Sequence, residues 1–183
     1  MSDVSQRQIR RLAFQVLYQL DARSGQDPDA VLASTMNQDE DSADRVDFTP
    51  ADRKKAFELA SQSYANRDKA DAFMLEIAPG WPAHRQAAVD RAILRLAHFE
   101  MTSGRTHPKI AVNEAIELAK LFSTDKSPAF INGLLDKLLK TVLTQTPDGT
   151  ASGEGPRSEP QEELPGTGTR ARGGEQPGTV EAA

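Results

Sequence analysis

Three arginines near the start of the chain have the types and the spacing of a phosphate-binding stripe. Arg7, Arg10 and Arg11 lie three and four residues apart, so on a helix at least two guanidinium groups would project along adjacent lines. The amino end of a helix adds its dipole and its free amide groups, which also favour anions. An ordinary solvated face that pairs with acids such as Asp3 would show the same pattern, so these residues alone leave both interpretations open.

No enzymatic or metal chemistry stands out elsewhere. The chain has no cysteine, which excludes a disulfide, a thiol nucleophile and a zinc–thiolate site, and its three histidines share no helical spacing. Phosphate-binding loops, nucleophile elbows, dinucleotide fingerprints and zinc-protease motifs are missing from the sequence. Glu114 and Glu117 lie three residues apart, but solvated helical carboxylates explain them more simply. We therefore expect a protein that is not an enzyme and that uses neither a metal nor a cofactor.

Composition predicts one ordinary domain. The 183 residues are 38% apolar, 27% charged and 5% aromatic, with a formal net charge of -5. Residues 145–183 hold seven of the 27 acidic residues and three of the 22 basic ones, so the rest of the chain is nearly neutral. No stretch approaches the roughly 18 consecutive apolar residues that a membrane span needs, and the polar start has no signal-peptide core. We expect a cytoplasmic protein.

The sequence divides near Leu143 into a body and a tail. Beyond this residue lie eight of the twelve glycines and five of the eleven prolines, with only Leu164 and Val180 as large aliphatic residues. Such a segment cannot bury enough apolar surface to offset its ordering entropy. We predict a folded domain over residues 1–144 and a disordered, acidic, Gly/Pro-rich tail over residues 145–183, which is either an interaction arm or a dispensable extension.

The body carries the apolar spacing of amphipathic helices and no alternating strand pattern. Capping signals and prolines predict six helices, which begin near Ser5, Asp27, Thr49, Pro82, Pro108 and Ser127. The third should run from Pro50 towards Ile77 and can kink where the charged residues 67–69 interrupt its stripe. The acidic stretch from Asp39 to Asp47 is expected to be a solvated loop. The fold class is therefore all-α, a helical bundle with short connections.

Several segments in order resemble the NusB family. They are DRAILRLAHFE at 90–100, IAVNEAIELAK at 110–120 and FINGLLD at 130–136, together with RRLAFQVLY at 10–18 and the lone Trp81. The resemblance covers residues 5–143, and the order and spacing make it specific. It implies a compact bundle of two packed halves that is not an enzyme. It also implies a factor in transcription antitermination that binds boxA-type RNA of ribosomal RNA operons together with NusE, a small-subunit ribosomal protein, and that joins other Nus factors on RNA polymerase.

The resemblance also implies which residues face the RNA. Arg7 and Arg10 would contact it, with Arg11 a weaker candidate. A second RNA-facing part would consist of Lys126, Ser127, Phe130 and Asn132. Cations suit the phosphates, an aromatic ring suits the exposed bases of a single strand, and an amide suits base edges. A core contact for Phe130 and a local bracing role for Asn132 are the alternatives.

Two residues match positions that face NusE in the family, namely Tyr18 and Asp90. An ordinary half-buried tyrosine and a helix acid pairing near Arg91 are the alternatives. The polar residues Asn113, Glu114 and Glu117 are expected to brace the bundle through hydrogen bonds between helices.

The sequence departs from the family pattern at both ends, with Gln6 and Gln8 where relatives often have arginines, and with its long tail. Fewer cations predict weaker binding to RNA alone. Some family members form homodimers, so a homodimer is an open alternative. Two other functions remain open: an accessory domain that works with a separate ribosomal RNA methyltransferase, and a helical protein-interaction module that does not bind RNA.

Overall fold

The computed structural model describes residues 4–36 and 46–145, and within these ranges the chain forms seven α-helices and one short 3₁₀ helix. These described ranges contain no β-strand, and the predicted all-α fold class is confirmed. The predicted loop residues from Asp39 to Asp44 lie outside the described residues. So does the predicted tail, except for Gln145, which ends the last helix.

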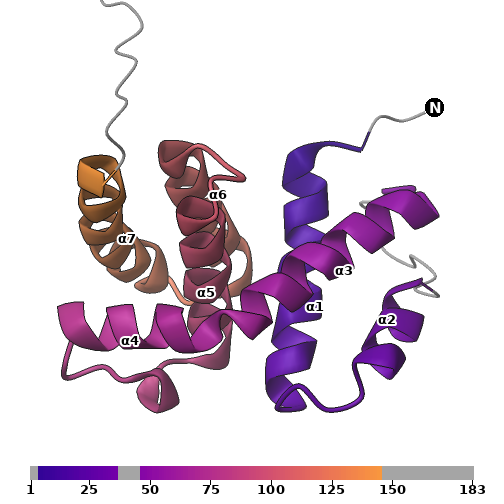
Figure 1. Cartoon of the computed structure of the whole chain (residues 1–183), viewed down its shortest axis with the longest axis horizontal. Coiled ribbons are helices and arrows are strands. Elements are labelled where there is room, and N and C mark those ends of the chain that lie inside the picture. Colours follow the sequence, from indigo (N-terminus) through magenta and orange to yellow (C-terminus); the bar gives the residue numbers. More distant parts are fainter. Residues whose placement is uncertain (1–3, 37–45, 146–183) are drawn as a thin grey trace, which may run out of the picture. The chain divides into compact units, whose positions relative to one another are not determined.

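Helices α1 (Gln6–Ala22), α2 (Pro28–Met36) and α3 (Pro50–Ala65) form one group. The predicted capping box at Ser5 is present: the Gln8 backbone N–H donates to the Ser5 hydroxyl at 3.3 Å, and the Ser5 N–H donates to the Gln8 side chain at 2.8 Å. Thr49 and Asp52 form a second box at the start of α3. The buried stripe of α1 packs against α3 and α2 (Figure 1).

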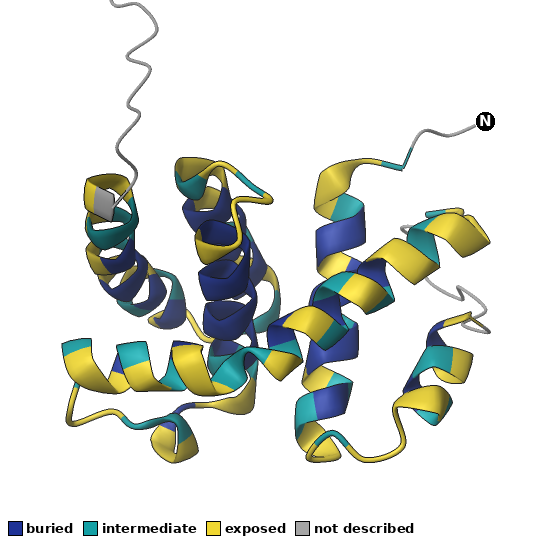
Figure 2. Cartoon of the chain, in the orientation of Figure 1, coloured by how far each residue is buried: buried dark blue, intermediate teal, exposed yellow. Residues whose placement is uncertain are grey.

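Helices α4 (Arg67–Ile77), α5 (Ala88–Thr102), α6 (Pro108–Phe122) and α7 (Ser127–Gln145) form the second group. Helix α5 lies at the centre, because it packs against α1, α3, α4, α6 and α7. Every residue from Ala92 to Met101 is buried, so α5 is dark blue along most of its length in Figure 2. The two groups, α1–α3 and α4–α7, are the two packed halves that the family resemblance implies. Helix α5 of the second group also packs against α1 and α3 of the first.

The structure differs from the predicted helices in two places. The predicted third helix is divided at Asn66, whose backbone leaves the helical region at φ -96° and ψ 9°, so α3 ends and α4 begins there. Pro82 starts only a 3₁₀ turn (Ala83–Arg85) rather than the predicted fourth helix. Helix α5 begins at Ala88, because the backbone at Gln86 is extended.

Part-buried ion pairs join the two halves. Both Asp21 oxygens on α1 are bound: Arg91 Nη2 lies 2.6 Å from Oδ2, and Arg95 Nη1 lies 2.6 Å from Oδ1. Arg95 also pairs with Asp71 of α4 at 2.6 Å. Burial alone would raise the pKa of Asp21, but the hydrogen bonds from Arg91 and Arg95 outweigh it and lower the pKa. The carboxylate therefore stays charged and ties α1 to α5.

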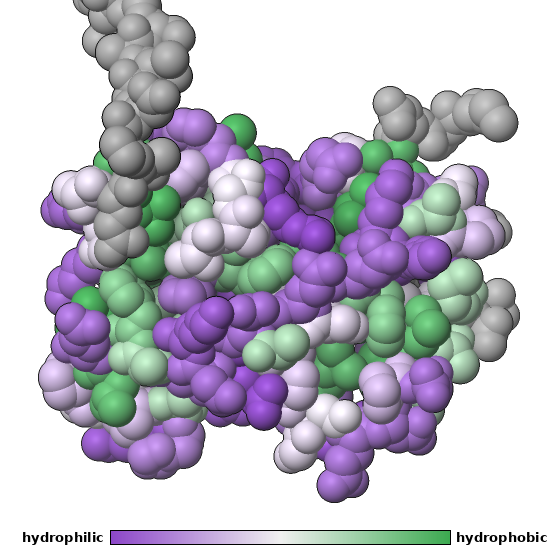
Figure 3. All heavy atoms as spheres, viewed as in Figure 1, coloured by the Kyte–Doolittle hydropathy of each residue, from purple (hydrophilic) through white to green (hydrophobic). Residues whose placement is uncertain are grey.

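The outer sides of α3 and α4 are mostly polar. Hydrophilic residues follow both helices across the face shown in Figure 3. Within the described residues, no helix is long and apolar enough to cross a membrane.

Candidate nucleic-acid interface

Arg7 projects from the first turn of α1 and remains mostly in solvent. Its side chain is 62% exposed, while its Nη2 donates to Glu114 Oε1 of α6 at 2.8 Å and its Nε contacts both Glu114 oxygens at 3.1 Å. The hydrogen bonds and the charge of Glu114 raise the pKa of Arg7 above its usual value, so this side chain is a permanent cation. The carboxylate fixes one edge of the guanidinium, and Nη1 has no partner among the described residues.

Arg10 is buried, in contrast to the prediction that it contacts RNA. Its side chain is 9% exposed and donates to both oxygens of Glu100 on α5 at 2.9 and 3.0 Å. Glu114 lies 3.4 Å from its Nη1, and Thr106 donates to the same Glu100 carboxylate at 2.7 Å. A guanidinium enclosed by two carboxylates is not available to an incoming strand. The prediction of a direct RNA contact for Arg10 is therefore corrected to a role in joining α1, α5 and α6.

Arg11 lies on the surface, in contrast to Arg10. It is exposed, and its guanidinium lies over the ring of Phe122 at 5.3 Å from the centroid. Phe122 is the last residue of α6 and also contacts Phe14 of α1, with ring centroids 5.0 Å apart. The Phe122 ring therefore holds the Arg11 guanidinium in place without neutralising its charge. Arg11, a weaker candidate than Arg10 from the sequence, is the better placed of the two.

Asp90 of α5 holds the connection from α6 to α7 through hydrogen bonds. The Ser123 hydroxyl donates to Asp90 Oδ1 at 2.6 Å, and the Ser127 hydroxyl donates to Oδ2 at 3.0 Å. Thr124 Oγ1 lies 2.9 Å from Ser127 Oγ and can donate to it. Asp90 and Ser127 are both buried. Asp90 was predicted to face NusE and Ser127 to face RNA, but neither side chain is open to a ligand. Instead the pair fixes residues 123–126, the connection that includes Lys126.

The other three residues of the second predicted RNA-facing part, Lys126, Phe130 and Asn132, have different environments. Lys126 is exposed and makes no ion pair within the described residues. Phe130 is half-buried, which falls between the core and RNA-facing alternatives, and it meets the Trp81 ring edge-on with centroids 5.9 Å apart. Asn132 is exposed, but two residues along a helix correspond to about 200° of rotation. The structure therefore does not bring Phe130 and Asn132 to one face.

Tyr18 remains a surface residue of α1. It is 40% exposed and lies two turns after Arg11 along the helix. The structure thus places Arg7, Arg11 and Tyr18 on the outside of α1, and Lys126 on the connection that begins just after Phe122. The expected bracing role is confirmed for Glu114, while Glu117 pairs within α6 with Lys120.

Sequence reasoning missed two contributors. Glu100 is the main partner of Arg10, yet it is separated from it by ninety residues, so no local spacing could have shown the pairing. Arg85 lies with its guanidinium 5.8 Å from the centroid of the Trp81 ring. The only sequence signal for that contact was an aromatic and a cationic residue four positions apart.

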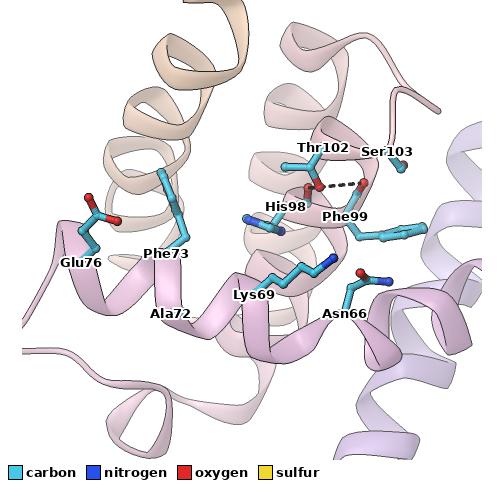
Figure 4. Close-up of a pocket in the computed structure, with 9 residues that line it drawn as sticks. All are labelled: Asn66, Lys69, Ala72, Phe73, Glu76, His98, Phe99, Thr102 and Ser103. Atoms are coloured by element: carbon cyan, nitrogen blue, oxygen red, sulfur yellow. Dashed lines mark hydrogen bonds between the residues drawn. The ribbon is translucent and has the colours of Figure 1, made fainter. Parts of the chain in front are cut away.

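A separate pocket of about 590 Å³ lies between α4 and α5 and contains none of the predicted site residues. In Figure 4 the His98 ring reaches from α5 towards Phe73 of α4, and their ring centroids are 5.9 Å apart. His98 Nδ1 is buried and has no hydrogen-bond partner in the described structure. Burial, followed by the charge of Lys69, lowers the pKa of His98, so the imidazole is neutral at pH 7. The described residues contain no cluster of side chains that could hold a metal ion.

Comparisons with known proteins agree on one family. A sequence model of the NusB family matches residues 7–140. The chain is 37% identical over 141 residues to transcription antitermination protein NusB of Symbiobacterium thermophilum, covering 75% of this chain and 90% of that protein. It is 42% identical over 136 residues to the protein of the same name from Geotalea uraniireducens, covering 73% and 93%. A solved structure of T. maritima NusB superposes with a TM-score of 0.64 at 27% identity, covering 75% of this chain and 92% of that one.

Proposed function

Because this chain belongs to the NusB family, we propose that it is a transcription antitermination factor that binds single-stranded, boxA-type RNA of ribosomal RNA operons together with NusE. In this proposal the chain and NusE join other Nus factors on RNA polymerase. The chain does no chemistry on the transcript; it binds and positions it. The observation that carries the proposal is the placement of Arg7, Arg11 and Lys126, three exposed cations on fixed supports.

The RNA path begins at the arginines of α1. Arg7 offers a free guanidinium edge, and Arg11 offers a charge held over Phe122, so both suit phosphate oxygens. Lys126 follows on the connection that Asp90 fixes. Phe130 lies one turn further and offers part of its ring to a base. Asn132 lies on another side of α7, so we place it outside this path.

Arg10, Ser127 and Asp90 act through other residues in this proposal. Arg10 holds α1 against α5, which sets the direction in which Arg7 and Arg11 project. Asp90 and Ser127 hold the connection under Lys126. These three are positioning residues rather than ligand contacts, because burial keeps their polar atoms inside the fold.

Tyr18 is the proposed anchor for NusE. A ring that is 40% exposed presents apolar area together with a hydroxyl, a combination enriched at protein interfaces. Its place on α1, beyond Arg11, would let NusE extend the surface that meets the RNA. Asp90 influences this partner only by holding the nearby connection.

A salt-dependent RNA titration tests the proposal, using labelled boxA-like and scrambled strands with and without NusE. Three phosphate contacts predict a slope of roughly -2 on a plot of log affinity against log salt concentration. We expect the pair to bind the boxA-like strand substantially more tightly than the chain alone does. A complex that does not bind RNA even at low salt would overturn this proposal and favour an interaction module without RNA. Equal affinity with and without NusE would contradict the joint binding with NusE.

A further inference from the structure

Trp81 is exposed to an unusual degree for the largest apolar side chain. It is the only tryptophan of the chain and lies between α4 and the 3₁₀ turn, with 42% of its surface in solvent. Tryptophan is highly buried on average, and its exposure is typical of binding surfaces, where one ring meets a partner. Nothing in the function proposed above accounts for this ring.

The backbone around Trp81 is held in one conformation. The backbone N–H of Trp81 donates to the Ala78 carbonyl at 2.9 Å, and the side-chain amide of Gln86 donates to the Trp81 backbone carbonyl at 3.0 Å. Gln86 is itself buried at 6% exposure, so the donor of this part-buried bond is held inside the fold. The backbone that carries the indole is thereby fixed, which lowers the entropy cost of ordering this segment when a ligand binds.

Two neighbours give the ring its chemical character. Phe130 packs against the indole edge-to-face, with an interplanar angle of 65°. The Arg85 guanidinium lies 5.8 Å from the ring centroid, and its Nη1 donates to the Gly80 carbonyl at 3.3 Å. Arg85 makes no ion pair with an acid among the described residues, so its charge is available. An exposed aromatic face beside an unpaired cation matches a nucleobase with its phosphate.

The position of this cluster is continuous with the RNA path. Phe130 follows Lys126 by one helical turn, and its N–H donates to the Lys126 carbonyl at 3.3 Å. A strand that has reached Lys126 and Phe130 therefore meets the indole next. We infer that Trp81 and Arg85 form a base-stacking site for single-stranded RNA, in which one base stacks on the indole and Arg85 contacts the adjoining phosphate. This inference rests on the proposed function and adds two residues to its ligand surface.

The single tryptophan allows a direct test on the unmodified full chain. RNA of the boxA-like sequence is titrated into the protein, in the presence of NusE where needed, and Trp81 emission and its quenching by acrylamide are followed after correction for RNA absorbance. We expect the emission to change and acrylamide access to fall, with the same midpoint as binding of labelled RNA measured by polarisation. Protection produced by NusE alone, with no further effect of RNA, would assign this ring to the protein partner and overturn the inference.

Variants give the second measurement. Trp81→Ala should weaken RNA binding roughly tenfold or more, and Trp81→Phe, which keeps a ring, should retain most of the affinity. Ile110→Ala is the control, because it truncates an exposed apolar side chain in the first turn of α6, at the opposite end of that helix from Phe122. This variant should bind RNA like the parent. RNA binding with unchanged Trp81 emission and an unaffected Trp81→Ala variant would remove the stacking site and leave the proposed function standing. Failure of the parent complex to bind any RNA would remove both.

Discussion

Arg10 and Arg11 are adjacent in the sequence but have opposite environments. One helical step turns the side chain by about 100°, which takes Arg10 between Glu100 and Glu114 and leaves Arg11 in solvent above Phe122. Only the outer residue can meet a ligand without breaking the fold. A substitution should therefore affect stability at one position and binding at the other.

Arg10→Ala should lower the free energy of unfolding by about 3–5 kcal/mol, because it leaves the buried Glu100 carboxylate without its charge partner. For a domain of this size the melting temperature should fall by roughly 10 °C. Thermal unfolding, monitored by circular dichroism, measures this fall in melting temperature. Arg11→Ala is the matched control, with an almost unchanged melting temperature but weaker RNA binding. Comparable melting of both variants would contradict the burial of Arg10.

His98 should make the fold sensitive to mild acid. Its pKa is lowered in the folded state, so between that value and about 6.5 the unfolded chain binds more protons than the folded one does. The free energy of unfolding should therefore fall as the pH decreases through this window. Urea titrations from pH 7.5 to pH 5 measure the slope, and His98→Gln should flatten it, whereas His84→Gln, at an exposed position, should not.

At the scale of elements, the most consequential feature is the connection between α6 and α7. Four residues, 123–126, join the two helices and include Lys126, and their order depends on hydroxyl groups that converge on Asp90 at the start of α5. A surface lysine thus owes its position to a buried carboxylate on another helix. In the proposed function, this coupling is the route by which Asp90 influences binding without contacting a ligand.

Asp90→Ala should loosen this connection, because it leaves the part-buried Ser123 hydroxyl and the buried Ser127 hydroxyl without their carboxylate acceptor. We expect a loss of about 1–3 kcal/mol in the free energy of unfolding and faster hydrogen exchange at residues 123–127. Exchange followed by mass spectrometry measures it. Asp125→Ala, which removes an exposed acid from the same connection, should leave exchange there unchanged; equal effects of the two variants would argue against the clamp.

Helix positions were largely predictable from the sequence, because capping boxes, prolines and apolar spacing are local signals. Ser5 with Gln8 and Thr49 with Asp52 mark helix starts in the structure. The break at Asn66 was not predictable to the residue, because a single non-helical conformation there leaves the apolar spacing nearly continuous. The exposure of the site residues was less predictable still. Whether Arg7, Arg10 or Arg11 meets an acid depends on α5 and α6, which are distant in the sequence.

For the molecule as a whole, α1–α3 and α4–α7 are held together by apolar contact and by charge. Asp21, Arg95 and Asp71 form a chain of ion pairs from α1 through α5 to α4. Arg95 is buried at 6% exposure, so each carboxylate compensates a charge that would otherwise be costly inside the fold. Arg95 thus connects both groups of helices.

Removal of residues 146–183 should leave the folded domain intact. Among the described residues, the buried apolar cluster runs from Ile9 to Leu138, and α7 reaches Gln145. We expect the shortened chain to keep its helical circular dichroism spectrum and a melting temperature within about 2 °C of the parent, because a deletion outside the core changes stability little. A marked loss of helix or a much lower melting temperature would mean that these residues support the domain.

The central position of α5 has a consequence for how the protein denatures. Because both groups of helices use α5 as a wall of their core, neither retains a complete interior once α5 is released. Heat should therefore melt all the described helices in one cooperative event, with the calorimetric enthalpy equal to the van't Hoff enthalpy. The proposed RNA binding would then be lost in a single step, with no half-folded species left to retain it.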